Sequence, residues 1–167
     1  GDAYWYSVMM ADFVSQLREG IFPPLVGQTE FAFNGAVAPL RVAPFLQYLG
    51  GAIDFITLGS LSFTSILNLS LLVACLGGGF SCYGCLRAIQ PETPWLALLF
   101  SLLFSFCPAI LALVYVGNLF MSVTTLPFIP LLLYGIWRTL VKGDRAAVLA
   151  MIAAAGALWY CHPPIAL

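Results

Sequence analysis

Charged side chains are scarce in this sequence. Asp, Glu, Lys and Arg make up 8% of its 167 residues, whereas ordinary soluble domains contain about 25%. The six Lys and Arg residues form no basic patch, so we expect no nucleic-acid partner. Hydrophobic residues account for 62% of the chain and its mean hydropathy is +0.99, which indicates a membrane protein rather than a soluble domain.

Further shortages limit the chemistry that the chain can carry. It contains one His, and its motif Cys82-Tyr-Gly-Cys85 has no second Cys pair to complete a zinc site. All five cysteines lie in or beside apolar segments, where we expect them to pack between helices as small apolar residues. The chain has neither an initiator Met nor a signal peptide at its start, so we expect it to be part of a larger membrane protein.

A long uncharged stretch covers residues 93–137. A membrane-spanning helix needs roughly 20 apolar residues, so this stretch can cross a bilayer twice if it turns at Gly117-Asn118. With the apolar segments on either side, the sequence predicts transmembrane helices at about residues 60–86, 94–116, 119–141 and 146–161. Pro108 is expected to kink the second of them. The predicted fold class is therefore all-α, a polytopic transmembrane helical bundle.

Residues 1–59 form the polar part of the chain and are predicted to be an external loop with amphipathic juxtamembrane helices. Residues 4–19 show helical spacing and Gly20 follows as a stop, which predicts a helix on the membrane surface with Asp12 solvated. Residues 45–58 are too short to span, so we expect an interfacial or re-entrant helix. A charge in lipid is costly, so Asp54 should face the loop or be buried against protein.

The cations of the short turns give the predicted spans an orientation. They fall on one side of the membrane if the spans are correct: Arg87, Arg138, Lys142 and Arg145. Cytoplasmic loops are enriched in Lys and Arg, so this side is predicted to be cytoplasmic. Residues 1–59, Gly117-Asn118 and His162 then share the external side, where we expect a polar site.

Asp2, a short aromatic run, a surface helix and Gly20-Ile-Phe-Pro-Pro24 follow one another in the chain. This order resembles the first external loop of the glycosyltransferase C superfamily of membrane enzymes, with a distant likeness to protein O-mannosyltransferases and aminoarabinose transferases. The kink Ser105-Phe-Cys-Pro108 also keeps the superfamily's order. The ending His162-Pro163-Pro164 and the helix at Leu126-Pro127 are similar to bacterial pyruvoyl-tetrahydropterin-synthase-related and YfhO-like membrane proteins.

The resemblance implies a transferase that uses a polyprenyl-phosphate-linked sugar at the external face of a bacterial inner membrane. Asp2 would be the catalytic residue, which deprotonates the acceptor or binds a divalent metal, and His162 would contact the donor phosphate. Many members carry a second acidic residue where this chain has Asn118. Asn118 would therefore orient substrate, and the resemblance does not decide whether the reaction depends on a metal. Glu30 and Arg41 lie in the loop and either pair with each other or contact substrate.

Other readings of these residues remain. Asp2 at a helix start also fits an N-cap, and His162 at a helix end also fits a polar interface residue. A non-catalytic membrane protein of the same fold would bind a lipid or a partner subunit through the external loop. A transporter is the third possibility, although transporters place polar groups near the bilayer midplane and this chain concentrates them at one face.

Overall fold

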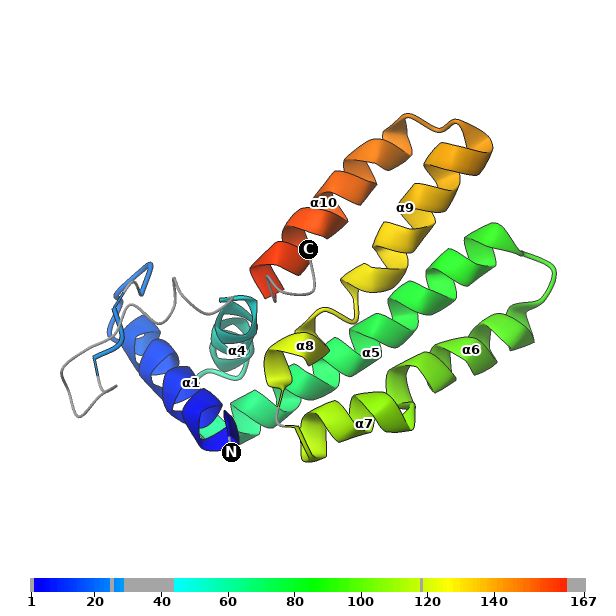
Figure 1. The fold of residues 1–167 in the computed structure, drawn as a ribbon. Helices are drawn as coiled ribbons and strands as arrows, with labels where there is room; N and C mark the ends of the chain where they lie inside the picture. The colour runs from blue at the N-terminus through cyan, green and yellow to red at the C-terminus, as the bar shows by residue number, and fades with distance from the viewer. Residues whose placement is uncertain (1, 25, 29–43, 118, 162–167) are drawn as a thin grey trace.

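The computed structural model describes residues 2–24, 26–28, 44–117 and 119–161. These residues form α-helices and connecting turns but no β-strand, which confirms the all-α prediction. The chain forms two antiparallel helical hairpins, the first of which contains the longest described helix, and two further helices lie across one end of them (Figure 1).

The longest described helix is α5 (Phe63–Ile89), whose 27 residues extend for about 40 Å. Ser62 caps its start, because the Ser62 hydroxyl accepts a hydrogen bond from the backbone N–H of Ser65 at 3.2 Å. Gly78 and Gly79 allow close packing of other segments against α5. A Cβ at Gly78 would lie 2.8 Å from the Cβ of Leu126, and a Cβ at Gly79 would lie 2.6 Å from the Ser105 hydroxyl.

The chain returns along α5 through α6 (Pro94–Phe106) and α7 (Pro108–Tyr115). The break between them lies at Cys107, whose ψ is 150°, because Pro108 has no N–H to continue the helical hydrogen bonds. The predicted kink is therefore confirmed. By length and composition, two helical segments are able to cross a membrane among the described residues, namely Phe63–Ile89 and Pro94–Tyr115.

The predicted segment 119–141 is not one helix. It is divided into α8 (Phe120–Thr124) and α9 (Phe128–Lys142), with Pro127 at the start of α9. A Gly143 with a φ of +62° ends α9, and α10 (Ala146–Cys161) runs back beside it. The 15 and 16 residues of these two helices extend for only about 22 and 24 Å, so the third and fourth membrane crossings stay predictions.

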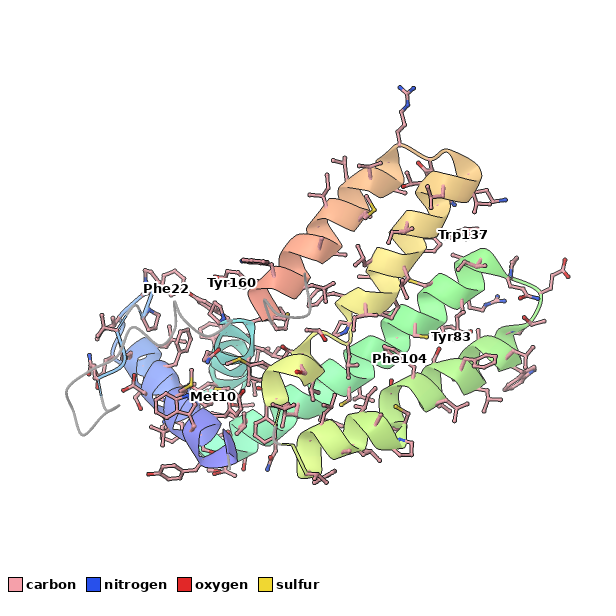
Figure 2. All side chains as sticks on the ribbon, viewed as in Figure 1. Met10, Phe22, Tyr83, Phe104, Trp137 and Tyr160 are labelled. Carbon is pink, nitrogen blue, oxygen red and sulfur yellow. The ribbon has the colours of Figure 1, made fainter. Side chains whose placement is uncertain are left out.

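Two helices lie across one end of the hairpins, α1 (Asp2–Arg18) and α4 (Phe45–Ile56), as Figure 1 shows. The side chain of Met10 is 1% exposed and belongs to the core shared with α4 and α5 (Figure 2). Gly20 ends α1 as predicted. Its φ is +81°, its N–H bonds the carbonyl of Leu17 at 3.0 Å, and the N–H of Ile21 bonds the carbonyl of Gln16 at 2.9 Å.

The prediction that Asp12 is solvated is wrong, because Asp12 is only 5% exposed. Both of its carboxylate oxygens accept the backbone N–H of Gln28, at 3.0 and 3.1 Å, and one accepts the side-chain amide of Gln16 at 2.9 Å. The same amide donates to the carbonyl of Val26 at 2.9 Å. The segment that follows α1 therefore folds back over the face of the helix that the sequence assigns to solvent.

Candidate functional site

Most of the predicted site residues lie outside the described residues: Glu30, Arg41, Asn118 and His162. Asp2 is described as the first residue of α1. The described residues that follow Asp2, follow Asn118 and precede His162 meet around the short helix α8. Its five residues are all buried, so α8 contacts other helices on every side.

The start of α1 contacts the start of α8. The ring centroids of Tyr6 and Phe120 are 5.2 Å apart and the rings are tilted by 39°, within the distance at which aromatic pairs contact. Tyr6 lies one helical turn after Asp2, and Phe120 lies two residues after Asn118. The first turn of α1 is thus close to the turn that precedes α8.

The end of α10 also reaches α8 and α4. Cys161, the last described residue, is fully buried, and α10 packs against α8, with Thr124 as the neighbour of Cys161. Burial raises the pKa of the Tyr48 phenol in α4. The nearby phenol of Tyr160 raises it further, so the end of α10 lies close to α4. The residues just before His162 therefore pack against the same group of helices as the start of α1 (Figure 2).

The turns that carry the cations lie at the opposite end of the hairpins (Figure 1). One is the turn between α5 and α6, where Arg87 donates a hydrogen bond to the carbonyl of Pro91. The other is the turn between α9 and α10, where Nε of Arg138 donates to Asp144 at 3.1 Å and this contact lowers the pKa of the Asp144 carboxyl. The two predicted groups of residues are thus separated in the fold, and their assignment to the two sides of a membrane stays a prediction.

A pocket of about 630 Å³ lies where α1 and α4 end, lined by residues of both helices and of their following turns. Its polar part is a bidentate ion pair. Nη2 of Arg18 lies 2.6 Å from one oxygen of Asp54, and Nε lies 3.0 Å from the other. The hydrogen bond to Asp54 raises the pKa of Arg18. Asp54 is 6% exposed, which confirms that it is buried against protein.

The pocket and the predicted catalytic residue are at opposite ends of α1. The helix rises by 1.5 Å per residue, so Asp2 and Arg18 are about 24 Å apart. The fold thus separates a polar pocket from the region around α8. Within the described ranges, no group of three or more His, Cys, Asp or Glu side chains is suited to hold a metal ion.

The sequence does not reveal the Arg18–Asp54 pair, because its members are 36 positions apart. The sequence does contain a separate indication for each member of the pair. Asp54 is a lone charge in an apolar helix, which requires a partner, and Arg18 occupies the last turn of a helix that ends at a glycine. The sequence does not show that the two helices are neighbours, so it does not predict that Arg18 and Asp54 form a pair.

Comparison with known protein families matches residues 42–167 to the 6-pyruvoyl-tetrahydropterin synthase related domain, a family of membrane proteins. The chain belongs to this family. Membership confirms the predicted membrane protein and the resemblance to the pyruvoyl-tetrahydropterin-synthase-related proteins, whereas the link to the glycosyltransferase C superfamily stays a prediction. No curated protein and no solved structure matches the chain.

The family match begins after α1 and covers α4 to α10. The pyruvoyl-tetrahydropterin-synthase-related part thus contains both helical hairpins, α8 and Asp54. Arg18, the partner of Asp54, lies before the matched residues. The pocket is therefore formed jointly by the family region and the segment that precedes it.

Proposed function

We propose that this protein is a membrane glycosyltransferase that transfers a sugar from a polyprenyl-phosphate-linked donor at the external membrane face. One observation carries the proposal. The start of α1 contacts α8 through Tyr6 and Phe120, and the end of α10 contacts α8 through Cys161 and Thr124. Two segments that are distant in the sequence, one next to Asp2 and one next to His162, thus meet the short helix that follows Asn118.

The proposal assigns a role to each predicted residue. Asp2 is the base that deprotonates the acceptor hydroxyl or the ligand of a divalent metal. His162 donates a hydrogen bond to the donor phosphate. Asn118 orients substrate, because an amide cannot act as a base, and Glu30 and Arg41 contact substrate or each other.

A second candidate function is lipid binding without catalysis. The observation that favours it is the pocket with the Arg18–Asp54 pair, which lies about 24 Å from Asp2 along α1 and so does not require a reaction at that residue. A protein of this kind would use the pocket to hold a lipid or to bind a partner subunit in the membrane.

Turnover of a lipid-linked sugar by the full-length protein in nanodiscs tests the proposal. Asp2→Asn keeps the size of the side chain and removes its basicity, so we expect turnover to fall by roughly 100-fold or more with the melting temperature unchanged. Glu19→Gln is the matched control, because Glu19 is an exposed carboxylate directly after the far end of α1. This variant should retain turnover within about twofold of the wild type.

The outcomes separate the two candidate functions. Unchanged turnover in Asp2→Asn removes Asp2 from catalysis. If the wild-type protein turns over no polyprenyl-phosphate-linked sugar while it still binds lipid, the glycosyltransferase proposal is overturned in favour of lipid binding.

A further inference from the structure

The pocket between α1 and α4 combines a charged interior with an apolar mouth. Arg18 and Asp54 form its polar part, and Gly20, Gly51 and Gly59 also line it. The mouth consists of three large apolar side chains that are strongly exposed: Phe22 at 74%, Phe55 at 80% and Leu58 at 90%. Figure 2 labels Phe22, which follows α1.

The guanidinium of Arg18 is held in place with part of its hydrogen-bonding capacity unused. Nε and Nη2 donate to Asp54, and Nη2 also donates to the carbonyl of Gly59 at 3.3 Å. The group lies 5.2 Å above the ring of Phe63, which fixes its plane. Across the described part of the chain, no acceptor bonds the two hydrogens of Nη1. An arginine side chain that is 38% exposed thus presents a fixed N–H edge.

Asp54 supplies the opposite charge in the same pocket. Its oxygens accept two hydrogen bonds from Arg18, whereas a carboxylate has about four acceptor positions. Together the two residues are neutral but dipolar. A ligand with one anionic and one cationic group matches this dipole, while an anion alone would meet the carboxylate at short range.

The exposed apolar side chains at the mouth of the pocket indicate that the charged ligand group carries an apolar tail. The chain belongs to a family of membrane proteins, so Phe22, Phe55 and Leu58 are suited to contact hydrocarbon rather than water. A polar interior beside an apolar rim fits a molecule whose headgroup is charged and whose tail is apolar.

We propose that this pocket binds the headgroup of a zwitterionic phospholipid that carries a primary ammonium. The phosphate oxygens accept hydrogen bonds from Nη1 of Arg18, the ammonium donates to Asp54, and the acyl chains leave across Phe22, Phe55 and Leu58. This lipid site is distinct from the proposed reaction site at Asp2. It rests on the second candidate function, lipid binding in this pocket, whose ligand it names, and it does not depend on sugar transfer.

Binding of short-chain phosphatidylethanolamine to the purified full-length protein, measured by calorimetry, tests the proposal. Phosphatidylcholine has no N–H on its ammonium and phosphatidylglycerol has no cation, so both should bind at least about fivefold more weakly. Free phosphoethanolamine lacks acyl chains and should bind more weakly still. Equal affinity for phosphatidylethanolamine and phosphatidylcholine would overturn the role of Asp54, and equal affinity for free phosphoethanolamine would overturn the role of the rim.

Two pairs of variants sharpen the measurement. Arg18→Lys keeps the charge beside Asp54 but removes the Nη1 edge, so affinity should fall about tenfold, whereas Arg87→Lys at the opposite end should have no effect. Phe55→Ala removes part of the rim and should weaken binding about threefold or more. Ile56→Ala is its control, because Ile56 is 76% exposed on the same helix but does not line the pocket.

If Arg18→Lys lowers the melting temperature, the comparison of Phe55→Ala with Ile56→Ala tests the proposal in its place. Equal effects of Phe55→Ala and Ile56→Ala would show that lipid contacts the helix without using the pocket, and this overturns the proposal. The readout is lipid binding rather than turnover, so its failure is distinguishable from failure of the proposed glycosyltransferase function.

Discussion

The layer formed by α1 and α4 and the hairpin formed by α5 and α6 bury different kinds of side chain. In the layer, polar side chains are inside and have partners: Asp12, Gln16, Gln47 and Asp54 are each at most 6% exposed. In the hairpin, large apolar side chains face outward: Leu96, Leu99, Phe100, Leu102 and Leu103 of α6 are each at least 50% exposed. The polar interior of the layer is stabilised by specific hydrogen bonds, and its strongly exposed apolar side chains at the pocket gather at the rim, whereas α6 presents an apolar face along its length, which belongs to a hydrocarbon setting.

The largest effect should come from a charge placed on the apolar face of α6. Leu99→Arg puts a cation near the middle of a predicted span, at a cost of about 2.5–3.5 kcal/mol if this face contacts lipid. Membrane insertion, measured by alkaline extraction and glycosylation mapping, should fall clearly.

Ile56→Arg is the control for the α1–α4 layer, because Ile56 is exposed but lies at the end of α4. It should insert as the wild type does. If both variants insert equally well, the exposed face of α6 is not in hydrocarbon and the contrast between the two regions fails.

The next effect concerns the buried hydrogen bonds of Asp12. Asp12→Ala leaves the N–H of Gln28 and the amide of Gln16 without this acceptor, which should lower the free energy of unfolding by about 1–3 kcal/mol. Thermal unfolding in detergent measures the change, and the exposed Glu19→Ala should be within about 0.5 kcal/mol of wild type. Equal stability of Asp12→Ala and wild type would contradict the buried network.

A smaller effect is expected where α5 meets the turn before α9. A Cβ at Gly78 would lie 2.8 Å from the Cβ of Leu126 and 3.3 Å from its backbone carbon, so Gly78→Ala should destabilise the protein by about 1–2 kcal/mol. A Cβ at Gly84 of the same helix meets nothing within 4 Å. Gly84→Ala should therefore be neutral or stabilising, and a loss of stability in both variants would point to the backbone rather than to packing.

The smallest effect should come from the ion pair at the opposite end of the molecule. Arg138 lowers the pKa of Asp144 below its ordinary value of 3.8. A carboxyl with a depressed pKa in the folded state stabilises the protein above its ordinary pKa and loses this contribution as the pH falls through its folded value. Asp144→Asn should therefore melt slightly below the wild type at neutral pH and match it in strong acid; a constant difference across this range would contradict the pair.

The sequence predicts the helices better than their contacts. The break at Pro108 was predictable because proline removes one N–H, and the end of α1 was predictable because Gly20 accepts a positive φ. The sequence analysis does not predict the break at Pro127, since the average hydropathy over residues 119–141 does not register the hydrogen bond that proline removes.

The candidate site was less accessible to sequence analysis. Asp12 was assigned to solvent because helical periodicity describes a helix alone, whereas its burial comes from Val26 and Gln28, which fold over it. Arg18 and Asp54 meet only because α1 packs on α4, a tertiary contact that no local pattern contains. The sequence does predict that both cationic turns lie at the same end of the hairpins, because this follows from the number and direction of the helices.

The position of α8 has a consequence for how the chain is made. All five residues of α8 are buried, and its partners include Tyr6 near one end of the chain and Cys161 near the other. Synthesis proceeds from the N-terminus, so α10 leaves the ribosome only after every other described helix. During translation α8 therefore stays incompletely covered until α10, the last of the described helices to emerge, packs against it.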